Sequence, residues 1–119
     1  MSSTAAVFGE ANHADYAAAK AGMAYGLTHS LKNEIVRLAP LGRVNCVCPG
    51  WTDTPMAAGH TDDPAAVHRA TATMALRKVA RPEDIAAAIV FLTSDRLAGH
   101  ISGAVLTIAG GMEGRLLHP

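Results

Sequence analysis

The sequence predicts an α/β fold: the C-terminal portion of a doubly wound parallel sheet flanked by helices, with the N-terminal half of that fold absent from the 119 residues. Helical and strand patterns alternate along the chain, as in parallel sheets whose strands are joined by helices. The strand segments are too apolar to leave one face in water, so helices are expected on both faces. Only about three strands are visible, and the first begins directly at Met1 without the neighbours that a parallel sheet requires.

The first half of the chain predicts a strand, a long helix and a second strand. The first strand is expected in "SSTAAVF", residues 2–8. Apolar side chains spaced by three, four or seven predict an amphipathic helix over residues 13–39, which Pro40 and Gly42 end. The β-branched run "GRVNCVCPG" predicts a buried strand that passes into a loop at its Pro-Gly pair.

The second half predicts two more helices and a last strand. Residues 51–80 have the mixed composition of a loop that carries a short helix starting near Asp63 and Pro64. Pro82 suits the first position of a helix, and the two acidic residues after it suit the positive end of the helix dipole, which predicts a helix over residues 82–94. The segment "HISGAVLTIAGG" predicts a turn, a strand and a glycine turn.

Composition and charge exclude several kinds of partner. Ten basic and ten acidic side chains give zero net charge without any run of lysine or arginine, so neither a nucleic acid nor an anionic membrane is expected as a partner. The longest apolar stretches are too short to span a bilayer, and the N-terminus lacks the pattern of a signal peptide. A cytoplasmic location is therefore expected.

No metal site is expected either. Cys46 and Cys48 stand two apart on a predicted strand, so they should point the same way as small packed side chains, without forming a disulfide or a zinc site. Four potential ligands follow in one segment, but their Asp-Asp-Pro sequence is better explained as a helix start, and no pair has the tight helical spacing of known sites. These four residues are His60, Asp62, Asp63 and His68.

Tyr16 and Lys20 stand four positions apart on the predicted long helix and should project from the same face. A free tyrosine, with a pKa near ~10, is a poor base at neutral pH, but a nearby cation favours the phenolate. Ser3 lies thirteen residues ahead of Tyr16. Taken alone, the pair is better explained as a half-buried tyrosine beside a lysine whose stem covers apolar surface, and Ser3 as a plain strand-end serine.

These pieces together resemble the short-chain dehydrogenase/reductase family. "YAAAK" matches the YxxxK motif, with a serine thirteen residues ahead of the tyrosine, and "VNCVCPGWTDTPM" matches the N-x-V-x-PG-x-x-x-T segment. "RPEDIAAAIVFLTSD" is similar to the late helix of the family, and "ISGAVLTIAGG" to its last strand. The resemblance extends from residue 2 to about residue 111 and implies that residues 1–119 are a single incomplete Rossmann-type domain.

The resemblance implies an oxidoreductase that transfers a hydride between NAD or NADP and an alcohol or carbonyl substrate. Tyr16 would be the general acid/base, Lys20 would bond the nicotinamide ribose and favour the phenolate, and Ser3 would hold the substrate oxygen. Four further residues would line the nicotinamide side of the site, with ordinary turn chemistry as the alternative. They are Pro49, Gly50, Thr52 and Thr54.

The same resemblance implies a substrate pocket and an assembly. Met56, Met74 and Leu76 would be apolar pocket walls, with simple core packing as the alternative. A full-length relative would form a homo-oligomer through the long helix and the last strand.

The family's glycine-rich phosphate turn, its residue that selects NAD or NADP, and its catalytic asparagine are not in these residues. The chain alone is therefore expected to have little or no activity, and the choice of cofactor stays open. So does the origin of the chain: a natural truncation, a misassigned start or half of a split protein. A second interpretation is a non-catalytic remnant that only associates with a full-length relative or a complementary half.

Overall fold

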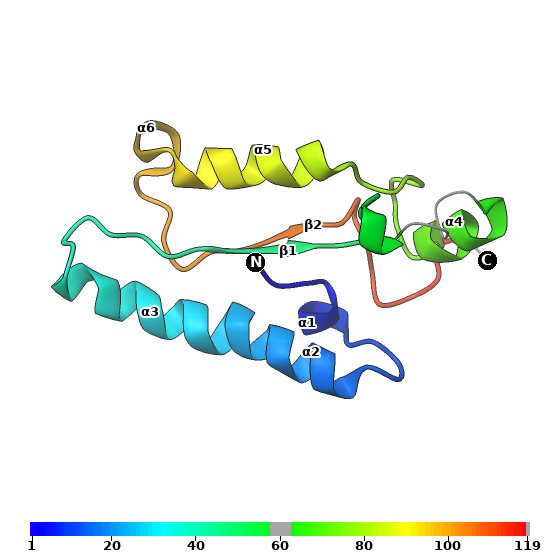
Figure 1. Cartoon of the computed structure of the whole chain (residues 1–119), viewed down its shortest axis with the longest axis horizontal. Helices are drawn as coiled ribbons and strands as arrows, with labels where there is room; N and C mark the ends of the chain where they lie inside the picture. Colours follow the sequence, from blue (N-terminus) through cyan, green and yellow to red (C-terminus); the bar gives the residue numbers. More distant parts are fainter. Residues whose placement is uncertain (58–62, 119) are drawn as a thin grey trace.

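Helices cover both faces of a short parallel sheet in the computed structural model, which describes residues 1–57 and 63–118 (Figure 1). Strands β1 (Cys46–Pro49) and β2 (Val105–Ile108) pair in parallel, with Cys46 opposite Val105 and Pro49 opposite Ile108. These are the second and the last of the three predicted strands, and both are confirmed. The alternation of strands with helices therefore gave the correct sheet type.

The predicted long helix is also confirmed, as one continuous helical segment on one face of the sheet (Figure 1). Its elements are α2 (Ala14–Ala21), the π-helical η1 (Gly22–Leu27), α3 (Thr28–Glu34) and the 3-10 turn η2 (Ile35–Arg37). The π-helical part was not predicted, because the apolar spacing of a sequence does not distinguish a π turn from an α turn.

The other face of the sheet is covered by α5 (Pro82–Thr93), followed by α6 (Asp95–Ala98) (Figure 1). The Asp84 carboxylate accepts a hydrogen bond from the backbone N–H of Arg81 at 2.8 Å, which closes the first turn of α5. Beyond the sheet lie η3 (Pro55–Ala57) and α4 (Pro64–Thr71). The Asp63 carboxylate caps α4 by accepting from the N–H of Ala65 at 2.9 Å, as the predicted helix start requires.

Alternate residues of β1 belong to two separate hydrophobic clusters. Cys46 and Cys48 pack against Ala24 of the long helix on one face. Val47 points the other way and packs against Ile85 and Leu92 of α5. The cysteines thus point the same way as small packed side chains, as predicted.

The strand predicted over residues 2–8 is wrong beyond its first residues. The N–H groups of Ser2 and Thr4 donate to the carbonyls of Val47 at 2.8 Å and Pro49 at 3.0 Å, and α1 (Ala5–Phe8) follows at once. In a full parallel ladder the Ser2 carbonyl would accept a hydrogen bond from residue 49, but a proline has no N–H to donate. The N-terminal segment therefore makes only one side of the ladder and turns into a helix.

Candidate functional site

Ser2 joins the N-terminal segment to the long helix. Its hydroxyl donates to the carbonyl of Lys20 at 2.6 Å, and the residue is 6% exposed. The next residue, Ser3, accepts a hydrogen bond from the N–H of Ala5 at 3.2 Å, so its oxygen lies at the start of α1. Ser3 thus lies between Ser2, which is bonded to the long helix at Lys20, and Thr4, whose N–H donates to the carbonyl of Pro49 at the end of β1.

Tyr16 and Lys20 share one face of α2, as their spacing predicted. The Lys20 Nζ lies 5.3 Å from the centroid of the Tyr16 ring, which is a cation–π distance. The tyrosine is 42% exposed. No hydrogen bond joins its hydroxyl to Ser3 or to another residue of the described part of the chain.

Pro49 and Gly50 form the carboxyl end of β1, where the sheet opens into its loops. The Gly50 N–H donates to the carbonyl of Ile108 at 2.9 Å and so continues the parallel ladder. A Cβ at Gly50 would lie 2.8 Å from the Cβ of Ala109, a distance that real side chains do not adopt. The glycine is therefore required by the close approach of these two segments.

The structure gives the two predicted threonines different surroundings. The Thr52 hydroxyl donates to the carbonyl of Gly50 at 3.0 Å, which is the turn chemistry left open as its alternative role. Thr52 also pairs with Ala80 in an isolated parallel bridge. Thr54 is half-buried, and its carbonyl accepts from the N–H of Ala57 at 2.8 Å at the start of η3.

Two of the three predicted wall residues, Met74 and Leu76, have different surroundings in the structure. Met74 is 1% exposed and lies in the core, whereas Leu76 is 58% exposed. The tail of the chain covers this region, since the Leu117 and His118 N–H groups both donate to the carbonyl of Ala72. The side chain of Met56 lies outside what the structure describes, as do His60 and Asp62.

The thiol of Cys48 is buried behind this site. Burial, together with the neighbouring Cys46, raises the pKa of the Cys48 thiol above its ordinary value of 9.0. The neutral thiol is therefore the form that the fold favours.

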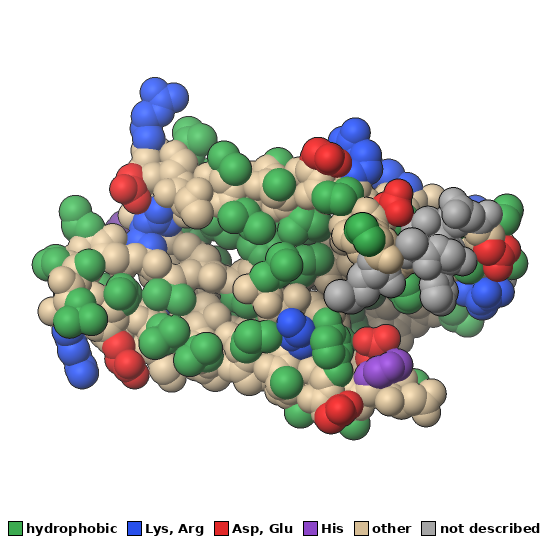
Figure 2. All heavy atoms as spheres, viewed as in Figure 1, with side chains coloured by type: hydrophobic (Ala, Val, Ile, Leu, Met, Phe, Trp, Pro, Cys, Tyr) green, Lys and Arg blue, Asp and Glu red, His purple; other side chains and the backbone are tan. Residues whose placement is uncertain are grey.

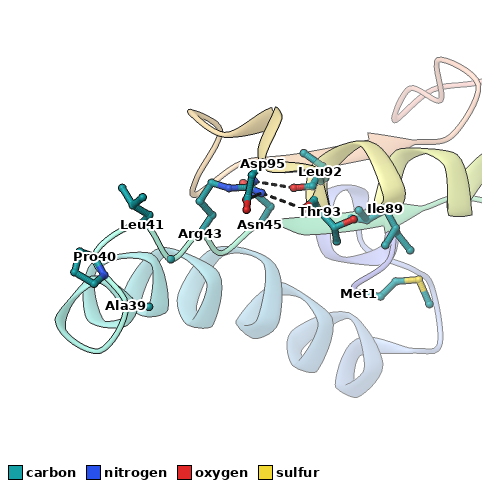
Figure 3. A pocket seen from close by; sticks show the side chains of 12 residues that line it. Met1, Ala39, Pro40, Leu41, Arg43, Asn45, Ile89, Leu92, Thr93 and Asp95 are labelled. Carbon is teal, nitrogen blue, oxygen red and sulfur yellow. Dashed lines mark hydrogen bonds and ion pairs between the residues drawn. The ribbon is translucent and has the colours of Figure 1, made fainter. Parts of the chain in front are cut away.

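A cavity of about 820 Å³ lies away from all the predicted site residues, between the end of the long helix and α5 (Figure 3). The end of the long helix lies toward the amino ends of the strands, whereas α2, which carries Tyr16, lies toward their carboxyl ends (Figure 1). Ligands of open parallel α/β sheets bind outside the carboxyl ends. The Arg43 guanidinium at this cavity donates to the carbonyls of Leu92 at 2.7 Å and Ile101 at 3.3 Å, so its chemistry is already used within the fold.

Asn45 begins the segment that matches N-x-V-x-PG-x-x-x-T, but its structural role was not predicted. Its side-chain amide donates to the carbonyl of Ile101 at 2.9 Å, and its oxygen accepts from the N–H of Ala104 at 3.0 Å. These bonds align the residues just ahead of β1 and β2. The available signal was a single asparagine directly before an otherwise apolar strand.

A family model described as "Enoyl-(Acyl carrier protein) reductase" matches residues 1–113. The chain is 47% identical over 116 residues to a cis-4-hydroxycyclohexanecarboxylate dehydrogenase from Sinomonas cyclohexanicum, covering 93% of this chain and 42% of that relative. The chain thus spans less than half the length of this relative.

Solved structures agree with this match. A 4-hydroxyisoleucine dehydrogenase mutant complexed with NADH and succinate has a TM-score of 0.86 and 26% identity, over 97% of this chain and 46% of that one. A structure from Agrobacterium tumefaciens with bound NADP has a TM-score of 0.82 and 33% identity, over 92% of this chain and 43% of that one. None of the described helices has the length and apolar character needed to cross a bilayer. The fold is a C-terminal portion of a Rossmann-type sheet, and the chain belongs to the short-chain dehydrogenase/reductase family.

Proposed function

We propose that the chain is the proton-transfer part of an NAD(P)-dependent oxidoreductase acting on a small alcohol or carbonyl compound. The observation that carries this proposal is the position of the Lys20 ammonium, 5.3 Å from the centre of the Tyr16 ring, on a helix bonded through Ser2 to the segment that carries Ser3. The tyrosine is exposed at the end of the sheet where ligands of this fold class bind.

Each of the three residues has one role in the proposal. Tyr16 passes a proton to or from the oxygen of the substrate, and Lys20 places its positive charge beside the phenol. Ser3 donates a hydrogen bond to the same oxygen and so stabilises the charge that develops on it. A phenol, a fixed cation and a neutral donor together provide what the deprotonation of an alcohol requires.

NAD or NADP, when bound, supplies the nicotinamide that gives or takes the hydride. The donors at this end of the sheet fit the nicotinamide half of such a cofactor, because Lys20 is half-buried with its ammonium beside Tyr16, and the loop after β1 presents backbone and hydroxyl groups. Pro49, Gly50, Thr52 and Thr54 would line that half. Residues 1–119 contain no glycine-rich turn for the phosphates, so the chain alone is proposed to have little or no turnover.

The test restores the missing part and then removes the phenol. The N-terminal portion of the Sinomonas relative is joined ahead of residue 1, and wild type is compared with Tyr16→Phe by nicotinamide absorbance. Tyr16→Phe is expected to lower kcat by at least about a hundredfold, the lower end of the range for loss of an acid/base group. Equal rates in the two proteins would exclude the acid/base role.

A second candidate function is non-catalytic association with a full-length relative or a complementary half. Large apolar side chains are exposed over much of the surface, and Figure 2 shows many of them along the long helix and between it and α5. The free side of the Met1–Thr4 segment offers an edge for such a partner. Sedimentation of the chain alone and mixed with the separately expressed N-terminal portion tests this, since an unchanged sedimentation coefficient in the mixture excludes association with that portion.

Homo-oligomerisation through the long helix and the last strand is proposed on the same ground. Leu27 and Leu31 of the long helix and Leu106 of β2 are all exposed. Sedimentation of the chain alone measures it directly.

A further inference from the structure

Two of the three buried polar residues in the described part of the chain bond to the same helix. Ser2 and Thr28 are 6% and 5% exposed. Ser2 donates to the carbonyl of Lys20 at 2.6 Å, and Thr28 donates to the carbonyl of Met23 at 2.7 Å. These two carbonyls lie near the beginning and inside the π-helical segment η1, so each buried hydroxyl is bonded where the backbone departs from α-helical geometry.

The π-helical segment is also where the long helix rests on the sheet. Ala24, in the middle of η1, is completely buried and packs against Cys46 and Cys48 of β1. A π turn closes over one residue more than an α turn, so it changes the rotational phase between the turns before it and those after it. The direction in which Tyr16 and Lys20 point therefore depends on how η1 is held against β1.

Ser2 is bonded on both sides at this junction. Its backbone N–H donates to the carbonyl of Val47 in β1, while its hydroxyl donates to Lys20 in the helix. The residue thus links the sheet to the backbone of Lys20 itself, and its neighbour in the chain is Ser3. A single residue couples the position of the serine to that of the Tyr16–Lys20 pair.

We propose that Ser2 is a positioning residue, which sets the separation between Ser3 and the Tyr16–Lys20 face by bonding the Lys20 carbonyl. Thr28 assists from the other end by holding the π turn. The inference rests on the proposed function only for its effect on turnover, since the effect on the geometry of Lys20 and Tyr16 is measurable in the chain itself.

The first measurement uses the chain alone and needs no turnover. The ring of Tyr16 shifts the NMR signals of the Lys20 side-chain methylenes, because the ammonium lies 5.3 Å from the ring centroid. Ser2→Ala is expected to reduce this ring-current shift, and Ser2→Thr, which keeps the hydroxyl, to retain it. The matched control is Thr71→Val, which removes another buried hydroxyl that bonds a helical carbonyl, that of Val67 at 2.8 Å.

The second measurement uses the same variants in the chimera described above. Ser2→Ala is expected to lower kcat by about tenfold or more, since small misplacements of reacting groups have such effects. The KM for the alcohol is expected to stay within about twofold, and the midpoint of the pH profile of kcat to move to higher pH. Thr71→Val is expected to lower the thermal unfolding temperature without moving that midpoint.

The outcomes separate this inference from the proposed function. If Ser2→Ala retains the ring-current shift and the pH midpoint of the wild type, the positioning role is wrong. If Ser2→Ala fails to fold, Thr28→Val takes its place, because it loosens the same turn from the other end and should reduce the same shift. If Tyr16→Phe turns over as fast as wild type, the acid/base role fails, and the NMR comparison alone then supports or overturns the positioning of Lys20.

Discussion

The guanidinium of Arg43 donates to the backbone carbonyl of Leu92 at 2.7 Å and so joins the chain just ahead of β1 to the end of α5. Only 11% of the Arg43 side chain is exposed, and it also donates to the Asp95 carboxylate at 3.0 Å (Figure 3). The carbonyls at the end of a helix have no partners within the helix, and a cation there also suits the helix dipole.

Arg43→Met is therefore expected to destabilise the chain by about 1.5–3 kcal/mol, the range for hydrogen bonds to a charged group. The change keeps most of the apolar length of the side chain and removes its donors. Urea unfolding followed by circular dichroism measures the effect, and Arg96→Met, on the exposed surface of α6, is the control. If both variants unfold at the same urea concentration, the bonds of Arg43 contribute little to stability.

Gly50→Ala is expected to destabilise the chain by about 1–3 kcal/mol, the usual effect of overpacking. The added Cβ would lie 2.8 Å from the Cβ of Ala109 and 3.1 Å from its Cα, so backbone on the neighbouring segment must move. The matched control is Gly26→Ala, where a Cβ meets nothing within 4 Å and a helix favours alanine. Gly26→Ala should unfold at the same or a higher temperature than wild type, and the same result for Gly50→Ala would contradict the contact.

The ionised Asp84 carboxylate stabilises the fold, and this stabilisation is lost in acid. The backbone N–H and the guanidinium of Arg81 lower the pKa of the Asp84 carboxyl from its ordinary value of 3.8. A lowered pKa in the folded state stabilises the fold above the unfolded pKa, and this contribution is lost as the pH falls through the folded value. Asp84→Asn should lower the midpoint of thermal unfolding at pH 6, and its difference from wild type should shrink as the pH falls from 3.8 through the folded pKa. A constant difference across that range would exclude the ionic contribution.

Cys48 lowers the free energy of unfolding at alkaline pH, whereas the effect of Asp84 appears in acid. The pKa of the Cys48 thiol is raised in the fold, chiefly by burial, so the unfolded chain ionises this thiol first. The stability that comes from the protonated Cys48 thiol is therefore fully present below pH 9.0. It is lost as the pH rises from there through the folded pKa. Cys48→Ala should show a smaller loss of stability between neutral and alkaline pH, measured by urea unfolding. In the native wild type, a thiol reagent should modify Cys48 only at the rate of unfolding.

The elements that the sequence predicted well have local signals at their ends. Pro82 and the acidic residues after it begin α5, and Asp63 begins α4, because caps and first-turn residues act through the backbone next to them. The same is true of the spacing of Tyr16 and Lys20, which one helical turn brings together.

What the sequence did not predict depends on contacts between distant segments. The N-terminal strand stops early because Pro49, more than forty residues away, cannot donate the bond that would complete the ladder. The π turn at η1 has no spacing signature in the sequence. The hydroxyl of Ser2, which bonds the Lys20 carbonyl beside this turn, comes from a residue eighteen positions away. Likewise, the burial of Met74 follows from the tail of the chain folding back over Ala72.

The one-sided hydrogen bonding between residues 2–4 and β1 also determines where a tag can be attached to the protein. Since Ser2 and Thr4 run parallel to β1, any residues placed ahead of Met1 are directed along the same strand toward Asn45. An affinity tag at that end would lie beside the backbone groups of β1, in the place that the N-terminal portion takes in the chimera described above. Purification handles and fluorophores therefore belong elsewhere on the chain, for example on the exposed surface of α6.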